Sequence, residues 1–387
     1  MRMLFTSTPL FGHFMPMLPL IGAALQAGHD VIVATGPDLE DEVGRRGLTL
    51  WEVGPSTAEV FGRRAALPEM PGATHLELLR RDVIAIFGWP GYERARDLTP
   101  LVLQWSPDVV VHEAADYAGW EVSAATGALS VAHGYGPHQP HTLELIKDVC
   151  SAAVEELGTP DRFDSVLASL YVDPWPAALR SDEPSPWTDV LDVRPDPRRS
   201  DLIASLPAEV IAMTGEPIVY VTFGTVFGSA EALAMVLEAV GGLPCNVVAT
   251  TGPTLDPASL GAVPDNVHVA SFLPQNLVLE HCAAVVSHAG SGTVLGALAA
   301  HLPQVCLPLA ADQFTNAERV APCGARIALP PDGRDVESMR RAVEAVLTDD
   351  SYASRAAAVQ AEIDTMPPAA EVLTTIEPRA GDRISNG

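Results

Sequence analysis

One stretch of the chain, residues 272–320, constrains its fold most strongly. It contains an apolar run at 283–288, a turn of small residues at 289–293, an alanine-rich segment at 294–300 and a second apolar run at 304–309. Short apolar runs rich in β-branched residues are typical of buried strands, and the segment between them is typical of a helix. The stretch therefore predicts a strand, a turn, a helix and a second strand of an α/β domain.

The glycine-rich turn is suited to a phosphate group. Gly290 and Gly292 allow the backbone to approach a ligand closely, and a helix that starts here offers free N–H groups and the positive end of its dipole. The turn contains no Lys or Arg. Peptide amides, the hydroxyls of Ser291 and Thr293, and His288 would therefore hold a diphosphate.

A polar pair, Asp312-Gln313, follows the second apolar run. Loops at the carboxyl ends of parallel strands face the same crevice, where α/β sheets bind ligands. A phosphate cradle beside an Asp-Gln pair indicates a nucleotide-linked sugar as ligand, although an ordinary surface turn would also explain the pair.

The chain of 387 residues is long enough for two domains. Strand and helix patterns alternate through the first half, prolines concentrate between 174 and 217, and a new strand is predicted at 218–223. We expect a first domain at 1–205, a second at 216–375 and a tail at 376–387. Helices between strands imply parallel sheets covered on both faces, so the predicted class is α/β with two doubly wound domains.

The first half contains its own strand signals and one insertion. Residues 63–96 predict helices and loops over the first sheet, interrupted near 88–91. The predicted strands are 2–7, 30–34, 108–112 and 129–133.

Composition excludes several classes of partner. A net charge of -26 argues against nucleic acid and anionic membranes. The chain has no membrane-length apolar run and no signal-peptide pattern at its start, which predicts a cytoplasmic protein. Its five cysteines are scattered without metal-ligand spacing, and no D-x-D triplet occurs. We therefore predict no metal and no cofactor, and the sequence leaves a homodimer open.

One histidine lies where a catalytic base could act. His13 follows the first predicted strand and precedes the helix that begins near Pro16, at the carboxyl edge of the first sheet. An imidazole with an ordinary pKa of about 6.5 can accept a proton near neutral pH, and an alcohol needs such a base to become a good nucleophile. A histidine that only caps the turn would look the same.

The stretch 272–320 resembles the donor-binding signature of the family 1 glycosyltransferases, especially those of actinobacterial natural-product (antibiotic) biosynthesis, and the resemblance extends from the first strand to about residue 346. It implies the GT-B fold, in which two Rossmann-like domains face a central cleft. His13-Phe-Met-Pro16 is similar to the H-x-x-P motif of the catalytic base in that family. An acid at the end of a later strand orients this histidine, and the matching residue is Glu113, where the family usually has Asp; Asp116 is the alternative.

The resemblance also implies which residues bind the donor. Phe272 would hold the nucleotide base, although it could equally be core, and Asp312 with Gln313 would bind the sugar hydroxyls. A loop at 222–225 would lie on the phosphate side, although a plain turn would look the same. The complete predicted donor set is Thr222, Gly224, Thr225, Phe272, Leu273, Gln275, His288, Gly290, Ser291, Gly292, Thr293, Asp312 and Gln313.

Gly296 bears on the identity of the nucleotide. Family members that use UDP-sugars commonly have a glutamate eight residues after the phosphate-binding histidine, where it holds the ribose hydroxyls; here that residue is Gly296. A lost charge-assisted hydrogen bond is worth about 1.5–3 kcal/mol, and deoxyribose has one hydroxyl fewer. The sequence thus favours a dTDP-sugar, although tight helix packing would also explain the glycine.

The sequence leads to one main functional hypothesis. We expect an inverting, metal-independent glycosyltransferase that moves a (deoxy)sugar from a dTDP-sugar to a hydroxyl of an apolar natural-product aglycone in antibiotic biosynthesis. The alternatives are a catalytically silent nucleotide-binding auxiliary protein and a GT-B nucleotide-sugar epimerase; a nicotinamide dehydrogenase is disfavoured because the first turn lacks G-x-G-x-x-G. Aromatic residues that could line the acceptor site, if they are not core, are Phe61, Phe87, Trp89, Tyr92 and Tyr135.

Overall fold

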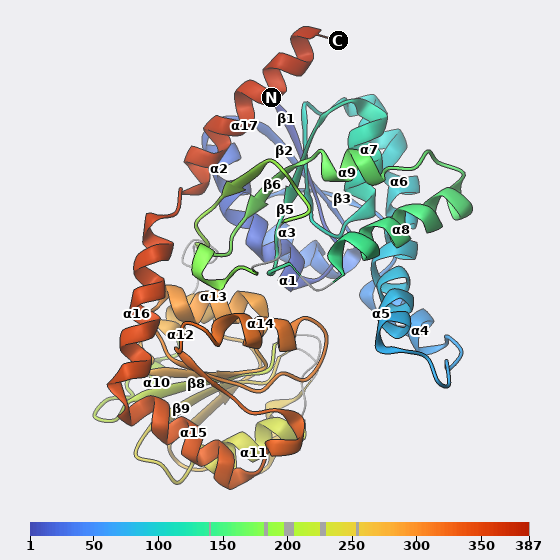
Figure 1. Ribbon diagram of the computed structural model, residues 1–387. Helices are drawn as coiled ribbons and strands as arrows, with labels where there is room; N and C mark the ends of the chain where they lie inside the picture. Colours follow the sequence, from blue (N-terminus) through green and yellow to red (C-terminus); the bar gives the residue numbers. More distant parts are fainter. Residues whose placement is uncertain (139–140, 182–184, 197–204, 225–229, 253–254, 387) are drawn as a thin grey trace. The chain divides into compact units, whose positions relative to one another are not determined.

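The structure is a computed structural model that describes the chain except for residues 139–140, 182–184, 197–204, 225–229, 253–254 and 387 (Figure 1). The chain forms two compact units. Unit 1 comprises 1–174, 183–193 and 367–387, and unit 2 comprises 175–182 and 194–366. The chain therefore passes between the units within the proline-rich stretch and returns to unit 1 at its end.

Unit 1 contains a seven-stranded sheet in the order β3-β2-β1-β4-β5-β6-β7, and its paired strands are all parallel. The order reverses between β1 and β4, because the chain builds one half of the sheet outwards from β1 and then returns to build the other. The strands are β1 (Arg2–Thr6), β2 (Asp30–Thr35), β3 (Thr49–Glu52), β4 (Val109–Glu113), β5 (Leu129–His133), β6 (Leu170–Asp173) and β7 (Val190–Asp192).

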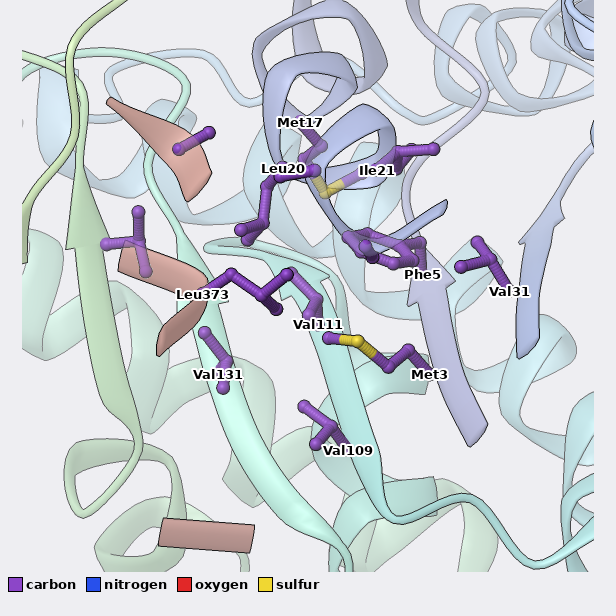
Figure 2. Packing of buried hydrophobic residues seen from close by; sticks show 14 of the residues in the cluster. Met3, Phe5, Met17, Leu20, Ile21, Val31, Val109, Val111, Val131 and Leu373 are labelled. Carbon is purple, nitrogen blue, oxygen red and sulfur yellow. The ribbon is translucent and has the colours of Figure 1, made fainter. Parts of the chain in front are cut away.

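Helices pack on both faces of this sheet because its strands are apolar on both sides. In β1, Met3 and Phe5 belong to one buried cluster, whereas Leu4 belongs to another. The first cluster joins the sheet to α2 (Leu18–Gln26) and α17 (Ala369–Asn386), and Figure 2 shows their side chains meeting those of β1, β4 and β5. The second joins it to α6 (Trp89–Trp105) and α7 (Tyr117–Thr126). The expected doubly wound arrangement is thus confirmed for unit 1.

The remaining helices of unit 1 connect the strands. The predicted interruption near 88–91 is instead a π-helical segment, η3 (Ile84–Gly88), which leads directly into α6 with Pro90 in its first turn, where proline is tolerated. The other elements are α1 (Phe11–Phe14), η1 (Met15–Met17), η2 (Pro37–Leu39), α3 (Glu40–Arg45), α4 (Thr57–Ala65), α5 (His75–Val83), α8 (Thr142–Leu157) and α9 (Phe163–Leu167).

The C-terminal residues differ from the predicted tail. Residues 376–386 continue α17, and Leu373, Ile376 and Ala380 of this helix are buried in the core of unit 1. The spacing of these apolar residues is helical, but Pro378 inside the helix interrupts the sequence pattern. No helix among the described residues combines the length and apolar character needed to cross a membrane.

Unit 2 repeats the architecture with six parallel strands in the order β10-β9-β8-β11-β12-β13. The order again reverses beside the unit's first strand, between β8 and β11. The strands are β8 (Ile218–Thr222), β9 (Asn246–Thr250), β10 (Val267–Ala270), β11 (Ala284–Ser287), β12 (Gln304–Cys306) and β13 (Arg326–Ala328).

The sheet of unit 2 is also covered on both faces. Val219 and Val221 of β8 belong to a cluster with α11 and α15, whereas Ile218 and Tyr220 belong to one with α10 and α12. The helical elements are η4 (Ala177–Leu179), α10 (Ala208–Ile211), α11 (Ala230–Val240), η6 (Pro257–Leu260), α12 (Gln275–Leu279), α13 (Ser291–Ala299), α14 (Gln313–Val320), η7 (Pro331–Gly333), α15 (Val336–Thr348) and α16 (Asp350–Thr365).

Candidate active site

The predicted functional residues gather where the strand order reverses in each sheet. In unit 1, His13 follows β1 and Glu113 ends β4, the strand paired with β1. In unit 2, Gly224 follows β8 and His288 follows β11, which pairs with β8. Open parallel sheets bind ligands at the carboxyl ends of strands at such a reversal. Each unit therefore has one candidate site at the position that its topology favours.

His13 and Glu113 form a close pair in unit 1. His13 Nδ1 lies 3.2 Å from Glu113 Oε1, an ion-pair distance without the alignment of a hydrogen bond. The histidine side chain is 12% exposed, and that of Glu113 is fully buried. Hydrogen bonds between catalytic groups often tighten only when substrate binds. A proton on Nδ1, facing the carboxylate, would leave Nε2 free to accept another.

Glu113 is held in its ionised form despite its burial. Burial by itself raises the pKa of this carboxyl, but the adjacent His13 imidazole and hydrogen bonds from Ala115 and Thr8 lower it to about 2. The Ala115 N–H donates to Oε2 at 2.7 Å, and the Thr8 hydroxyl donates to Oε1 at 2.8 Å. The carboxylate therefore remains charged near neutral pH and can stabilise a protonated imidazole.

Asp116 has a different partner from the one considered in the sequence. Its Oδ1 accepts hydrogen bonds from Arg94, 2.7 Å from Nη2 and 3.3 Å from Nε, and from the Ala118 N–H at the start of α7. Arg94 and Asp116 are 1% and 0% exposed. The geometry thus pairs His13 with Glu113 and leaves Asp116 to a buried guanidinium.

Two of the five predicted acceptor residues contact the His13 ring. The Tyr135 and His13 ring centroids are 4.0 Å apart, and those of Phe87 and His13 are 5.4 Å apart. Phe87 comes from η3, and Tyr135 comes from the loop after β5. Both side chains are partly exposed, so an apolar surface lies beside the imidazole.

The other three predicted acceptor residues are placed differently. Tyr92 is 3% exposed, its hydroxyl donates to the Val149 carbonyl at 2.7 Å, and its ring packs edge-on against Tyr117, so it is a core residue. Trp89 is half-buried at the start of α6, and Phe61 is half-buried on α4, a helix that packs against η3. Trp89 and Phe61 therefore lie on elements next to η3, the segment that carries Phe87.

In unit 2 the His288 ring lies between two glycines. A Cβ atom at Gly224 would lie 2.7 Å from His288 Cε1, and one at Gly290 would lie 2.5 Å from Nε2, so a side chain at either position would displace the ring. Gly224 also has a φ of 74°, which disfavours other residues. Burial lowers the pKa of His288, although the Thr222 backbone and Asp312 oppose the shift. His288 is therefore a neutral group at neutral pH.

The start of α13 presents the backbone amides predicted for a phosphate. Gly290 is the N-cap residue, and Ser291 begins the helix. Because glycine has no side chain, the N-cap residue itself places no capping group over the first N–H groups of the helix. The indole N–H of the fully buried Trp175 donates to Ser291 Oγ at 3.3 Å. Trp175 packs with Val294, Leu298 and other residues of α13, so it fixes the position of the helix start as well as the Ser291 hydroxyl.

Gln275 occupies the space beside Gly296. Its Nε2 donates to the Gly292 carbonyl at 3.4 Å, and its Oε1 accepts from the Thr293 hydroxyl at 3.1 Å. A Cβ atom at Gly296 would lie 2.9 Å from Gln275 Nε2. A side chain at position 296 would therefore have to displace the Gln275 amide.

Asp312 and Gln313 shape the loop after β12. Gln313 is buried, and its Oε1 accepts the N–H groups of Leu309 and Ala310 at 2.8 and 3.0 Å. Asp312 Oδ2 accepts from Asn316, which also donates to the Ala289 carbonyl in the phosphate turn. The Asp-Gln pair is thus not a plain surface turn, because Asn316 connects it to the turn after β11.

The remaining predicted donor residues fall into three groups. Phe272 is 64% exposed, so it is not core, whereas Leu273 is buried in the cluster beneath α12. Thr222 is buried, and its Oγ1 accepts from the Thr250 hydroxyl at 2.9 Å. Thr225 lies outside the described residues.

Sequence reasoning missed three polar residues at these sites: Thr8, Arg94 and Trp175. Arg94 lies in a helix whose pattern indicated only a cover for the sheet, and no sequence signal places its guanidinium beside Asp116. Trp175 stands between two prolines, which suggested a linker. Among the described residues, no group of three or more His, Cys, Asp or Glu side chains is arranged to hold a metal ion.

Comparisons with known proteins identify the class. Residues 23–196 match the N-terminal domain, and residues 234–378 the C-terminal domain, of the family described as erythromycin biosynthesis protein CIII-like. The L-demethylnoviosyl transferase of Streptomyces niveus is 30% identical, over 90% of this chain and 90% of that protein. The elloramycin glycosyltransferase ElmGT of Streptomyces olivaceus is 28% identical over the full length of both.

A solved structure agrees with the sequence relatives. The spinosyn rhamnosyltransferase SpnG complexed with thymidine diphosphate is 26% identical, has a TM-score of 0.80, and aligns over 97% of this chain and 100% of its own. The same enzyme has also been solved with the spinosyn aglycone, with the same TM-score. The chain belongs to the erythromycin biosynthesis protein CIII-like family of GT-B antibiotic glycosyltransferases and is itself a glycosyltransferase.

Proposed function

We propose that this glycosyltransferase moves a deoxysugar from a dTDP-sugar to a hydroxyl of an apolar natural-product aglycone in antibiotic biosynthesis, with inversion and without a metal ion. The observation that carries the proposal is the His13–Glu113 pair at the strand-order reversal of unit 1, with the Tyr135 and Phe87 rings against the imidazole. A proton acceptor beside an apolar surface suits a hydrophobic acceptor with a hydroxyl group.

The proposed reaction needs only the sugar donor, the acceptor hydroxyl and side chains and amides of this protein. His13 Nε2 takes the proton of the acceptor hydroxyl while its oxygen bonds to the anomeric carbon. The bond from that carbon to the diphosphate breaks on the opposite face, and its electron pair leaves with the nucleotide. Glu113 stays ionised and stabilises the imidazolium. Amides at the start of α13, the Ser291 and Thr293 hydroxyls, and neutral His288 bind the departing diphosphate.

The choice of dTDP rests on two observations. SpnG was solved with thymidine diphosphate, and it aligns over nearly all of this chain. Position 296 lacks the glutamate that would hold a ribose, and Gln275 fills the space beside it. The exposed Phe272 would then lie beside the base, while Asp312 and Gln313 would contact the sugar. In this proposal unit 1 binds the acceptor through Phe61, Phe87, Trp89 and Tyr135, and unit 2 binds the donor; Tyr92 is left out because it is buried.

Replacement of His13 tests the proposal. With dTDP-activated sugars and a library of apolar aglycones, we expect the wild type to form glycoside and His13→Ala to lower turnover about 10²-fold or more with unchanged dTDP affinity. His29→Ala is a matched control, because His29 lies at the amino end of β2, whereas His13 follows the carboxyl end of β1. Unchanged turnover in His13→Ala would remove this residue from the mechanism. Nucleotide binding without any glycoside product would favour the auxiliary protein or the epimerase.

A further inference from the structure

A buried polar network connects the His13–Glu113 pair to a second ion pair in unit 1. Arg94 Nη2 lies 2.7 Å from Asp116 Oδ1 and 3.3 Å from Thr8 Oγ1. The Thr8 hydroxyl donates to Glu113 Oε1, which faces His13. Thr8, Arg94, Glu113 and Asp116 are each at most 4% exposed. The hydroxyl of Thr8 is therefore the direct link between the two pairs.

Stability alone does not account for this network. A buried ion pair loses the hydration of both charges, and well-packed apolar residues usually stabilise a fold as much or more. Arg94 Nη1 and Asp116 Oδ2 are buried and lack hydrogen-bond partners among the described residues. The pair is thus incompletely compensated where it lies, which suggests that its charges serve the neighbouring site.

The charges of the network match one step of the proposed reaction. Glu113 and Asp116 are two carboxylates, and Arg94 supplies one fixed positive charge. With neutral His13 the group has one excess negative charge, and protonation of His13 brings it to zero. The network is therefore electrostatically balanced after the imidazole has accepted a proton, and that is the state which general base catalysis must stabilise.

We propose that Thr8 and Arg94 are positioning residues for the catalytic pair: Thr8 fixes the Glu113 carboxylate, and Arg94 orients Thr8 and holds the Asp116 charge in the same network. This inference rests on the function proposed above. Neither residue touches the substrate. The proton passes from the acceptor hydroxyl to His13, and Arg94, Asp116 and Glu113 keep their charges throughout.

The groups around this network define what can titrate. Beside Glu113 on β4, His112 is buried, and burial lowers its pKa; its Nδ1 faces the Glu113 carbonyl and its Nε2 faces the Ser130 hydroxyl. Tyr135 and Phe87 present aromatic rings to His13 from the loop after β5 and from η3. Among the described residues, the charged groups that this network connects to the His13–Glu113 pair are therefore Arg94 and Asp116.

The first test removes only the bridging hydroxyl. Thr8→Val keeps the size and branching of the side chain, and we expect it to lower kcat about tenfold with an unchanged KM for the dTDP-sugar. Thr8→Ser restores a hydroxyl and should return kcat to within about twofold of the wild type. Rates are measured with dTDP-glucose and an apolar polycyclic aglycone, and with water as acceptor in donor hydrolysis. Equal rates in wild type and Thr8→Val, or no recovery in a folded Thr8→Ser, would overturn the role of Thr8.

The second test changes charge without changing shape. Asp116→Asn leaves an oxygen that can accept from Arg94 and Ala118 but removes one negative charge. Protonated His13 is then less stabilised, so the acid limb of the kcat/KM profile should move to lower pH by about half a unit. Asp148→Asn, at the partly exposed pair with Arg80, should leave that limb in place. An unmoved limb in Asp116→Asn, or a move to higher pH, would contradict the proposed charge balance.

Failure of this inference differs from failure of the proposed function. If His13→Ala retains full turnover, the base assignment falls whatever the Thr8 variants do. If His13→Ala loses turnover but Thr8→Val and Asp116→Asn behave as the wild type, only the positioning role is wrong. Circular dichroism and thermal unfolding of each variant show whether a loss of rate reflects unfolding.

Discussion

The two candidate sites occupy equivalent places in similar sheets but are built from different chemistry. The site in unit 1 consists of buried charges, with Glu113 beside His13 and Arg94 beside Asp116. The site in unit 2 consists of a neutral His288 between glycines, helix amides and hydroxyls. A nearby carboxylate stabilises a base that has taken up a proton, whereas an anionic ligand is bound by N–H and O–H donors that it can approach closely. The same topology thus serves two chemical tasks through different residues.

The largest effect should come from neutralising the charged site. We expect Glu113→Gln to lower kcat about 10²–10⁴-fold while dTDP affinity stays unchanged, because the imidazolium loses its stabilising carboxylate. Glu121→Gln is a matched control, since Glu121 is a buried glutamate of the same unit that pairs with Arg162. Steady-state kinetics and calorimetric titration with dTDP separate the two readouts. Weakened dTDP binding in Glu113→Gln would mean that the charged site of unit 1 also contributes to nucleotide binding.

A smaller effect should follow from filling the space beside His288. Gly290→Ala places a Cβ 2.5 Å from His288 Nε2, so the ring must move away from its position in the turn. Losing one well-aligned hydrogen bond to the diphosphate weakens dTDP binding about tenfold. Gly242→Ala is the control in the same unit, because a Cβ there would lie 3.6 Å from its nearest neighbour, Arg340. Unchanged affinity in Gly290→Ala would show that His288 does not contact the nucleotide.

The contrast between the sites also explains what could be predicted from sequence. Strand and helix alternation predicted both sheets, since strands such as 109–113 and 218–222 begin with three or more consecutive apolar residues. His13 and His288 could be predicted from the sequence because each follows a strand, and the topology of a parallel sheet brings the carboxyl ends of its strands together. Glu113 was predicted only through the family resemblance.

The sequence did not predict contacts between residues that lie far apart in the chain. Arg94 reaches Asp116 from another helix, and Trp175 reaches Ser291 over 116 positions. Tyr92 was misplaced for a related reason, since an aromatic side chain at the surface and one in the core have the same sequence signature. Neither packing direction nor the depth of a side chain follows from local pattern when several helices cover the same sheet face.

A modest effect should come from removing the indole N–H behind the helix start. Trp175→Phe keeps most of the packing against α13 but loses the bond to Ser291 Oγ, so we expect dTDP affinity to fall about threefold to tenfold. Trp187→Phe removes a comparable bond, from Nε1 to the Val166 carbonyl at 3.0 Å in unit 1, and should leave dTDP affinity unchanged. Equal effects of the two substitutions would mean that Trp175 contributes only to overall stability.

The smallest effect should be that of metal removal, and it tests the neutral character of the second site most directly. Mg²⁺ prefers carboxylate oxygens and bridges them to phosphates, whereas the donors around His288 are amides, hydroxyls and an imidazole. The nearby carboxylate of Asp312 accepts from Asn316, which in turn holds the phosphate turn through Ala289. Excess EDTA should therefore leave the initial rate of transfer unchanged, and Mg²⁺ should restore nothing. A rate that falls with EDTA and returns with Mg²⁺ would mean that unit 2 also relies on charge, carried by a bound cation instead of by the chain.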